Sequence, residues 1–202
     1  MPNAMSIQIN TQKADCWQET AERISRTVDK LGLPIDEGIK ETVIVLNALG
    51  ISTRASCEGH LDSGTCAPWV DIASSDPRAD VSIVRLSEDA QQECNRNKKT
   101  EQEIRAIFAE VHKARRAVKA CHMEERRMLM AYLAEFYENR CVPYDHRLII
   151  RPLGTDGKSR LESQGADCQE VAGSEEKAQK LAAYQEEMRY FTGFLKQKFF
   201  YS

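Results

Sequence analysis

The sequence lacks the features that would assign it to a membrane, an export route or a common class of enzyme. No apolar run approaches the length of a membrane span, and no basic segment followed by an apolar core opens the chain as a secretory signal would. The P-loop, Gly-x-Gly-x-x-Gly, His-Glu-x-x-His and Gly-x-Ser-x-Gly motifs are all missing. These absences predict a cytoplasmic protein without a membrane partner, and they leave enzymatic activity and cofactors unassigned.

The chain also has little net charge and no cysteine pattern of a secreted scaffold. Its 202 residues carry a formal net charge of −3, which gives no global attraction to nucleic acid. The 7 cysteines are odd in number and scattered, so we expect reduced thiols. With 42% hydrophobic and 29% charged residues, the composition is that of a globular protein rather than a disordered one.

Hydrophobic periodicity predicts two helices followed by two short strands in the first part of the chain. Apolar residues at helical spacing run from Trp17 through Val28 to Leu31, which predicts one helix over this stretch. A second helix is expected to begin after Asp36 and to stop at Gly50. The predicted elements are helices at 15–31 and 36–50 and strands at 51–56 and 69–73.

A long helical segment occupies the middle of the chain, because no glycine or proline occurs from Arg78 through Val142. The residues Thr100-Glu-Gln-Glu103 have the form of a capping box, which predicts a helix over residues 101–139. Such a helix would be on the order of 55 Å long. Two arrangements stay open: a hairpin that breaks near the polar 91–99 stretch and packs across the sheet, or a projecting helix that forms a homodimer.

Two further strands and a final helix complete the predicted fold. We expect strands at 146–153 and 158–163 and a helix beginning at Ser174. Together the elements predict a single α+β domain over residues 6–202, with a small, mostly antiparallel sheet and helices packed on one side. Residues 87–140 form a helical insertion between strands or a projecting long helix.

Titratable and aromatic residues concentrate between residues 54 and 71, where a predicted strand ends in a loop that leads to the next strand. Pockets favour strand ends and their loops, so we predict a polar ligand site there. Its members are Arg54, Ser56, Cys57, Glu58, Gly59, His60, Trp69 and Asp71.

The residue types at this place suit a ligand with polar groups and a ring. Gly59 allows a tight turn or the close approach of a ligand, and Trp69 offers a flat face for stacking. We expect Asp71 to hold His60 or Arg54 in position. A nucleotide or a nucleic acid is the predicted partner, bound or chemically modified at this site.

Other interpretations of the same residues stay open. Cys57, His60 and Cys66 are zinc-type ligands, and the fourth would come from Cys141, His146 or Cys168; because no Cys-x-x-Cys pair accompanies them, we assign no metal ligand. Cys57 beside a cation is also a candidate nucleophile. The long helix carries basic residues that either contact phosphates or form a solvated face. These are Lys113, Arg115, Arg116, Lys119, Arg126 and Arg127.

The run from Gly38 to His60, with its Leu-Asn-x-x-Gly and Ser-Cys-x-Gly-His segments, resembles uncharacterised bacterial and phage proteins. With Pro68-Trp-Val-Asp71, it is also distantly similar to wybutosine-pathway tRNA methyltransferases, which carry Ser-Cys-Ser-Gly-Arg and a downstream tryptophan. That resemblance implies a nucleotide-related site with S-adenosylmethionine near Ser56, Cys57, Gly59 and Trp69. It covers about a fifth of the chain, and His60 stands where that family has arginine.

Overall fold

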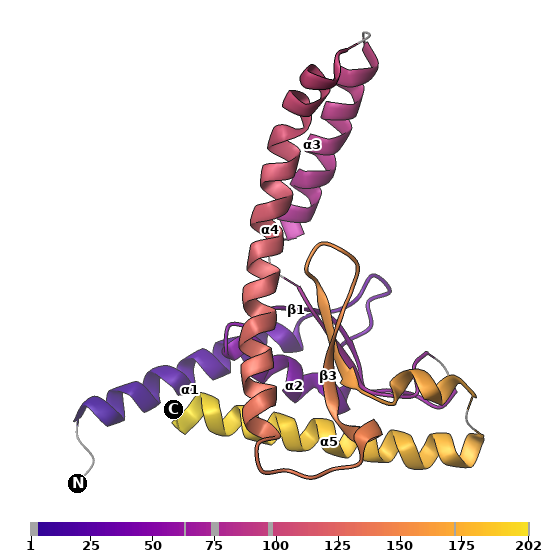
Figure 1. Cartoon of the computed structure of the whole chain (residues 1–202). Coiled ribbons are helices and arrows are strands. Elements are labelled where there is room, and N and C mark those ends of the chain that lie inside the picture. Colours follow the sequence, from indigo (N-terminus) through magenta and orange to yellow (C-terminus); the bar gives the residue numbers. More distant parts are fainter. Residues whose placement is uncertain (1–3, 63, 74–76, 97–98, 172, 202) are drawn as a thin grey trace.

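A small antiparallel sheet forms the centre of the molecule, and a two-helix hairpin projects from it (Figure 1). The computed structural model describes residues 4–62, 64–73, 77–96, 99–171 and 173–201. The strands are β1 (Thr53–Cys57), β2 (Trp69–Ile72), β3 (Leu148–Pro152) and β4 (Ser159–Ser163). Their order in the sheet is β1-β2-β4-β3, and every neighbouring pair is antiparallel. The predicted α+β fold is therefore confirmed.

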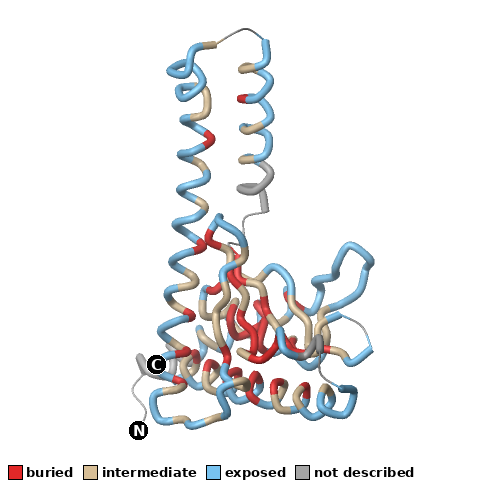
Figure 2. The backbone as a smooth tube through the Cα atoms, turned by 45° about the vertical axis from the view of Figure 1, so that its right-hand side comes forward, coloured by how far each residue is buried: buried red, intermediate tan, exposed pale blue. Residues whose placement is uncertain are grey.

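Helices cover one face of this sheet, as predicted. They are α2 (Glu37–Ala48), the C-terminal half of α4 (Glu101–Phe136) and α5 (Ser174–Tyr201). Alternate strand residues such as Val70 and Leu161 point into the core, where both are fully buried. Each such buried aliphatic side chain stabilises the fold by roughly 1.5–3 kcal/mol relative to an exposed one. Figure 2 shows this burial concentrated in the sheet and the segments packed on it.

The N-terminal helix differs from its predicted extent. α1 spans Ala4–Ser25 and ends earlier than expected, so Val28 and Leu31 are 56% and 82% exposed. The physical reason is a turn at Asp29, whose carboxylate accepts hydrogen bonds from the backbone N–H of Leu31 and Leu33 at 2.8 and 2.9 Å. This local side-chain bonding competes with helix formation, so the predicted end of the helix at residue 31 is wrong, and the helix also begins before the predicted residue 15.

The long helical segment folds back on itself at the predicted polar stretch. α3 (Pro77–Arg96) precedes α4, and the expected capping box begins α4: Thr100 Oγ1 accepts from the Glu103 N–H, and Glu103 accepts from the Thr100 N–H. The helix ends at Phe136 rather than at residue 139.

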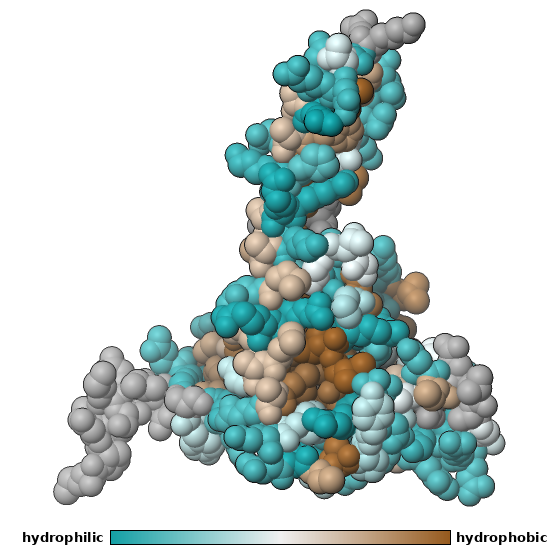
Figure 3. Space-filling model, viewed as in Figure 1, coloured by the Kyte–Doolittle hydropathy of each residue, from teal (hydrophilic) through white to brown (hydrophobic). Residues whose placement is uncertain are grey.

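This hairpin projects away from the body instead of packing across the sheet, which corrects the expected placement. Its members are mostly exposed, with Ala90 and Val111 buried at the seam between α3 and α4. The three core residues of α4, Leu129, Leu133 and Phe136, all lie in its C-terminal third. Figure 3 shows the corresponding surface: the hairpin is largely hydrophilic, and the largest visible hydrophobic patch lies on the body.

A buried carboxylate ties α4 to α5 and β3. Glu187 of α5, 5% exposed, accepts hydrogen bonds from the Tyr137 hydroxyl at 2.8 Å and from Arg140 at 2.7 Å. The backbone N–H of Leu148 in turn donates to the Tyr137 oxygen at 2.8 Å. Burial, reinforced by Glu187, raises the pKa of Tyr137, which keeps its hydroxyl protonated as a donor.

The direction of the hairpin is fixed where α4 crosses the β3–β4 turn. Gly157 in this turn has φ +90°, and a Cβ there would lie 3.1 Å from both the His122 Cβ and the Lys119 carbonyl oxygen of α4. His122 is only 2% exposed, and its Nδ1 lies 2.9 Å from the carbonyl oxygen of Asp156. Helix and turn are therefore in direct backbone contact.

We expect Gly157→Ala to destabilise the protein more than Gly154→Ala. Both glycines have positive φ, so both substitutions carry backbone strain of about 1–3 kcal/mol. Only at Gly157 would the new Cβ also press against α4, whereas at Gly154 the nearest atom, on Asp156, is 3.9 Å away. Urea unfolding of the two variants measures the difference. Equal losses of unfolding free energy would contradict the close contact described here.

Candidate functional site

Apart from Ser56, the predicted site residues occupy three separate places around β1 and β2. In the antiparallel register Cys57 lies opposite Trp69, and Ser56 lies opposite the core residue Val70. Trp69 therefore points to the face of the sheet that α2, α4 and α5 leave uncovered. Ser56 lines a cavity of about 450 Å³ between β1 and the segment 27–36.

The first place is a cluster of Asp36, Cys57 and His60 at the end of β1. Their carboxylate oxygen, sulfur and ring nitrogen all lie within 4.8 Å of one another. Asp36 is the residue immediately before α2. Its Oδ2 accepts a hydrogen bond from the Glu58 N–H at 3.1 Å and lies 3.4 Å from His60 Nε2. The Cys57 sulfur accepts the Gly59 N–H at 3.3 Å. Sequence reasoning missed Asp36, because it is far from Cys57 along the chain.

The loop that carries Cys57 and His60 is held on both sides. Gly59 has φ +85°, and a Cβ there would lie 2.8 Å from the Ala67 backbone, so only glycine fits. The Glu58 carboxylate accepts the Gly38 N–H at 2.7 Å, at the N-terminus of α2 where negative charge is stabilising. From α5, the Gln185 side chain donates to the Glu58 carbonyl at 2.9 Å. Glu58 and Gly59 therefore position the loop.

The second place is the open face of the sheet. Arg160 of β4 forms a two-pronged ion pair with Asp71 of β2, at 2.6 and 3.1 Å. Its guanidinium carbon also lies 3.8 Å from the centre of the Trp69 ring. We predicted that Asp71 holds His60 or Arg54 and that Trp69 offers a free stacking face. Arg160 is instead the partner of Asp71, and it covers one face of the indole.

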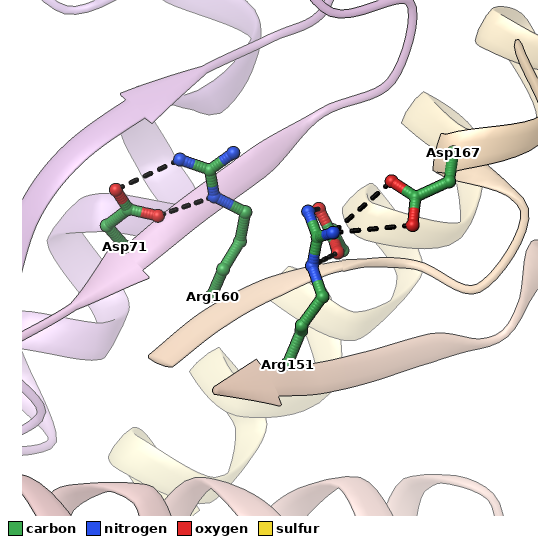
Figure 4. Close-up of polar contacts among 5 residues, drawn as sticks. Asp71, Arg151, Arg160 and Asp167 are labelled. Atoms are coloured by element: carbon green, nitrogen blue, oxygen red, sulfur yellow. Dashed lines mark hydrogen bonds and ion pairs between the residues drawn. The ribbon is translucent and has the colours of Figure 1, made fainter. Parts of the chain in front are cut away.

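A second arginine beside this pair is also held by carboxylates. Arg151 of β3 bonds to the buried Glu162 at 2.6 Å and to Asp167 at 3.3 Å (Figure 4). The charged side chains of this face thus pair with one another, whereas the buried indole N–H of Trp69 has no hydrogen-bond partner among the described residues. Burial raises the pKa of Glu162 although Arg151 opposes that shift.

The third place is a groove of about 770 Å³ between the base of the hairpin, the β3–β4 turn and Arg54 of β1. Its apolar lining residues include Val84, Val118 and Leu153. The described lining residues also bring five cationic side chains together with a single carboxylate, that of Asp156. The cations are Arg54, Arg115, Arg116, Lys119 and Lys158.

The groove divides the predicted basic run of the long helix into two sets. Lys113 and Arg127 lie outside it and pair with Glu110 and Glu124 on their own helix, at 3.7 and 2.6 Å. Arg116 and Lys119 line it and have no carboxylate partner within the described part of the chain. Arg115 also lines it, with the Ser87 hydroxyl 3.5 Å away. Sequence spacing did not separate these sets, and it gave no sign that Lys158 would join them.

The Cys57 thiol lies in surroundings that disfavour the thiolate. Burial raises its pKa, and the negative charges of Asp36 and Glu58 raise it further, while the hydrogen bond from the Gly59 N–H opposes them. Thiol nucleophiles require the opposite, a pKa lowered by nearby cations. Without a bound cation, this environment therefore does not favour Cys57 as a nucleophile.

Comparisons of the chain with protein-family models, curated proteins and solved structures find no match. Of the helices in the described part of the chain, none is long and apolar enough to cross a membrane.

We expect iodoacetamide to alkylate Cys57 more slowly than the exposed Cys121 at pH 8 with a chelator present. The raised pKa leaves less thiolate at Cys57, and its reactivity should increase only at more alkaline pH. Asp36→Asn should accelerate the reaction, because it removes a charge that opposes ionisation. Mass spectrometry of each cysteine peptide measures the rates. Labelling of Cys57 as fast as that of Cys121 in the unmutated chain would contradict this environment.

Proposed function

We propose that the protein binds nucleic acid through its phosphate groups, in the groove between the hairpin and the β3–β4 turn. The observation that carries the proposal is the convergence there, among the described lining residues, of five cationic side chains and one carboxylate from distant parts of the chain. The chain as a whole has a net charge of −3, so this local excess of positive charge is opposite in sign to the average surface. Phosphate contacts by lysine and arginine supply most non-specific affinity for nucleic acid.

The lining of the groove also supports a mode of binding. Arg115, Arg116 and Lys119 follow one helix, so their charges lie along an edge rather than around one point. An extended, repeating polyanion matches such an edge better than a single phosphate does. His112 is the only ring among the described lining residues. Without stacking platforms, the groove should contact the backbone with little preference for base sequence.

The other predicted functions have less support from the geometry. The apolar stripe that we expected to form a homodimer packs against α3 within the same chain, at Val111. The methyltransferase activity implied by the local resemblance stays a prediction, and the present proposal does not depend on it. A cytoplasmic location is part of the proposal, and all seven cysteines are free thiols, as a reducing compartment requires.

Charge reversal at the groove should abolish most of the binding. We expect the double variant Arg116→Glu/Lys119→Glu to bind a labelled single-stranded RNA at least about tenfold more weakly at low salt, because two phosphate contacts are lost. The slope of log K against log salt should fall by roughly 1 per lost contact. Fluorescence anisotropy over a range of salt concentrations measures both quantities.

The matched control is Lys113→Glu/Arg127→Glu, which makes the same change of net charge on the same helix outside the groove. It should leave binding within a small factor of the unmutated protein. Single-stranded DNA should bind similarly to RNA, and ATP should compete only weakly. Equal losses in the two double variants, or no binding of either strand at low salt, would contradict the proposal.

A further inference from the structure

We infer that Asp36, Cys57 and His60 form a binding site for a zinc ion, with a fourth coordination position open to solvent. The site lies at the C-terminal end of β1, on the loop side, whereas Arg54 near the other end of this strand reaches the basic groove. It is therefore independent of the proposed nucleic-acid binding.

The distances within the cluster are compatible with shared coordination of one ion, although the Asp36 carboxylate also bonds to the Cys57 side chain. His60 Nε2 and Asp36 Oδ2 are 3.4 Å apart, longer than the usual hydrogen-bond distance of about 2.7–3.2 Å. Two ligand atoms each about 2.0 Å from one zinc ion at a tetrahedral angle are roughly 3.3 Å apart. The Cys57 sulfur lies within 4.8 Å of a ring nitrogen of His60 and of a carboxylate oxygen of Asp36. Small side-chain adjustments would bring all three to one ion.

Backbone N–H groups around the cluster hold the ligand side chains in position, as hydrogen bonds around a metal site do. The Glu58 N–H donates to the Asp36 carboxylate, and the Gly59 N–H donates to the Cys57 sulfur. Such outer hydrogen bonds fix ligand geometry and tune a bound metal. Gly59 allows the tight turn that returns His60 toward Asp36, and the backbone N–H of His60 closes the loop on the Thr65 carbonyl at 3.1 Å.

The chemical nature and exposure of the three groups indicate which metal and which kind of site. A thiolate with an imidazole and a carboxylate suits Zn²⁺, whereas Mg²⁺ and Ca²⁺ prefer oxygen ligands alone. The side chains of His60 and Asp36 are 40% and 32% exposed, so the cluster is reachable from solvent. Three protein ligands with an open fourth position are typical of catalytic zinc, whereas structural zinc is enclosed by four.

The structure replaces one member of the ligand set considered from sequence. Cys66 was grouped there with Cys57 and His60, but the cluster contains Asp36 in its place. This difference provides a sharp control, because Cys66→Ser removes a nearby thiol without touching the proposed site.

The experiment is equilibrium dialysis of the full chain against zinc, followed by elemental analysis, with Co²⁺ as a spectroscopic probe. We expect one zinc per chain and a thiolate-to-cobalt charge-transfer band. Cys57→Ser and Asp36→Asn should each weaken zinc binding by more than about 100-fold, since even outer-shell changes cost 10–100-fold. Cys66→Ser should keep both the stoichiometry and the band.

Circular dichroism of each variant reports whether it is folded. If Cys57→Ser does not fold, His60→Ala, at a half-exposed position, replaces it as the ligand-deleted variant. Loss of zinc from folded His60→Ala would support the site as well. The inference is overturned if the unmutated chain binds no zinc at one equivalent, if folded Cys57→Ser or His60→Ala keeps its zinc, or if Cys66→Ser loses it equally. RNA binding by the same variants should be unchanged, which separates this inference from the proposed function.

Discussion

The close contact between α4 and the β3–β4 turn determines the shape of the rest of the molecule. Because Gly157 has no Cβ, the backbone of the turn meets α4 at Lys119 and His122. Below this point α4 belongs to the core, and above it α4 pairs with α3 as a hairpin that extends into solvent. The same contact brings Lys158 of the turn and Arg116 of α4 into the lining of one groove. Fold and proposed function thus share one steric requirement.

The edge strand β1 connects the two proposed sites. Arg54, close to its N-terminal end, lines the groove, and Cys57 at its C-terminal end belongs to the cluster with Asp36 and His60. As an edge strand β1 pairs with β2, and from α2 the Asn47 side chain donates to Thr53 at 2.8 Å. Asp36 lies immediately before α2, and α4 carries the cationic residues along the edge of the groove. The charged side chains on the open sheet face bind one another instead.

Local signals in the sequence predicted the elements well, because periodicity and caps act within a few residues. The capping box at Thr100 and the strand β4 follow such signals. Leu31 continues a helical pattern, yet the competing turn at Asp29 ends the helix first. The partnership of Asp71 with Arg160 joins residues 89 apart, and that of Asp36 with Cys57 depends on how α2 meets β1. Such pairings depend on tertiary structure, which no local pattern encodes.

The central claim is that this chain carries two separate sites, a metal cluster and a phosphate-binding groove. Amide chemical shifts of the ¹⁵N-labelled protein, followed by NMR during titration with zinc and then with single-stranded RNA, test it most directly. Zinc should perturb residues 36 and 57–60, and RNA should perturb residues 112–119 and 154–158. Perturbation of the Trp69–Arg160 face by RNA, or no localised change with either ligand, would contradict the account.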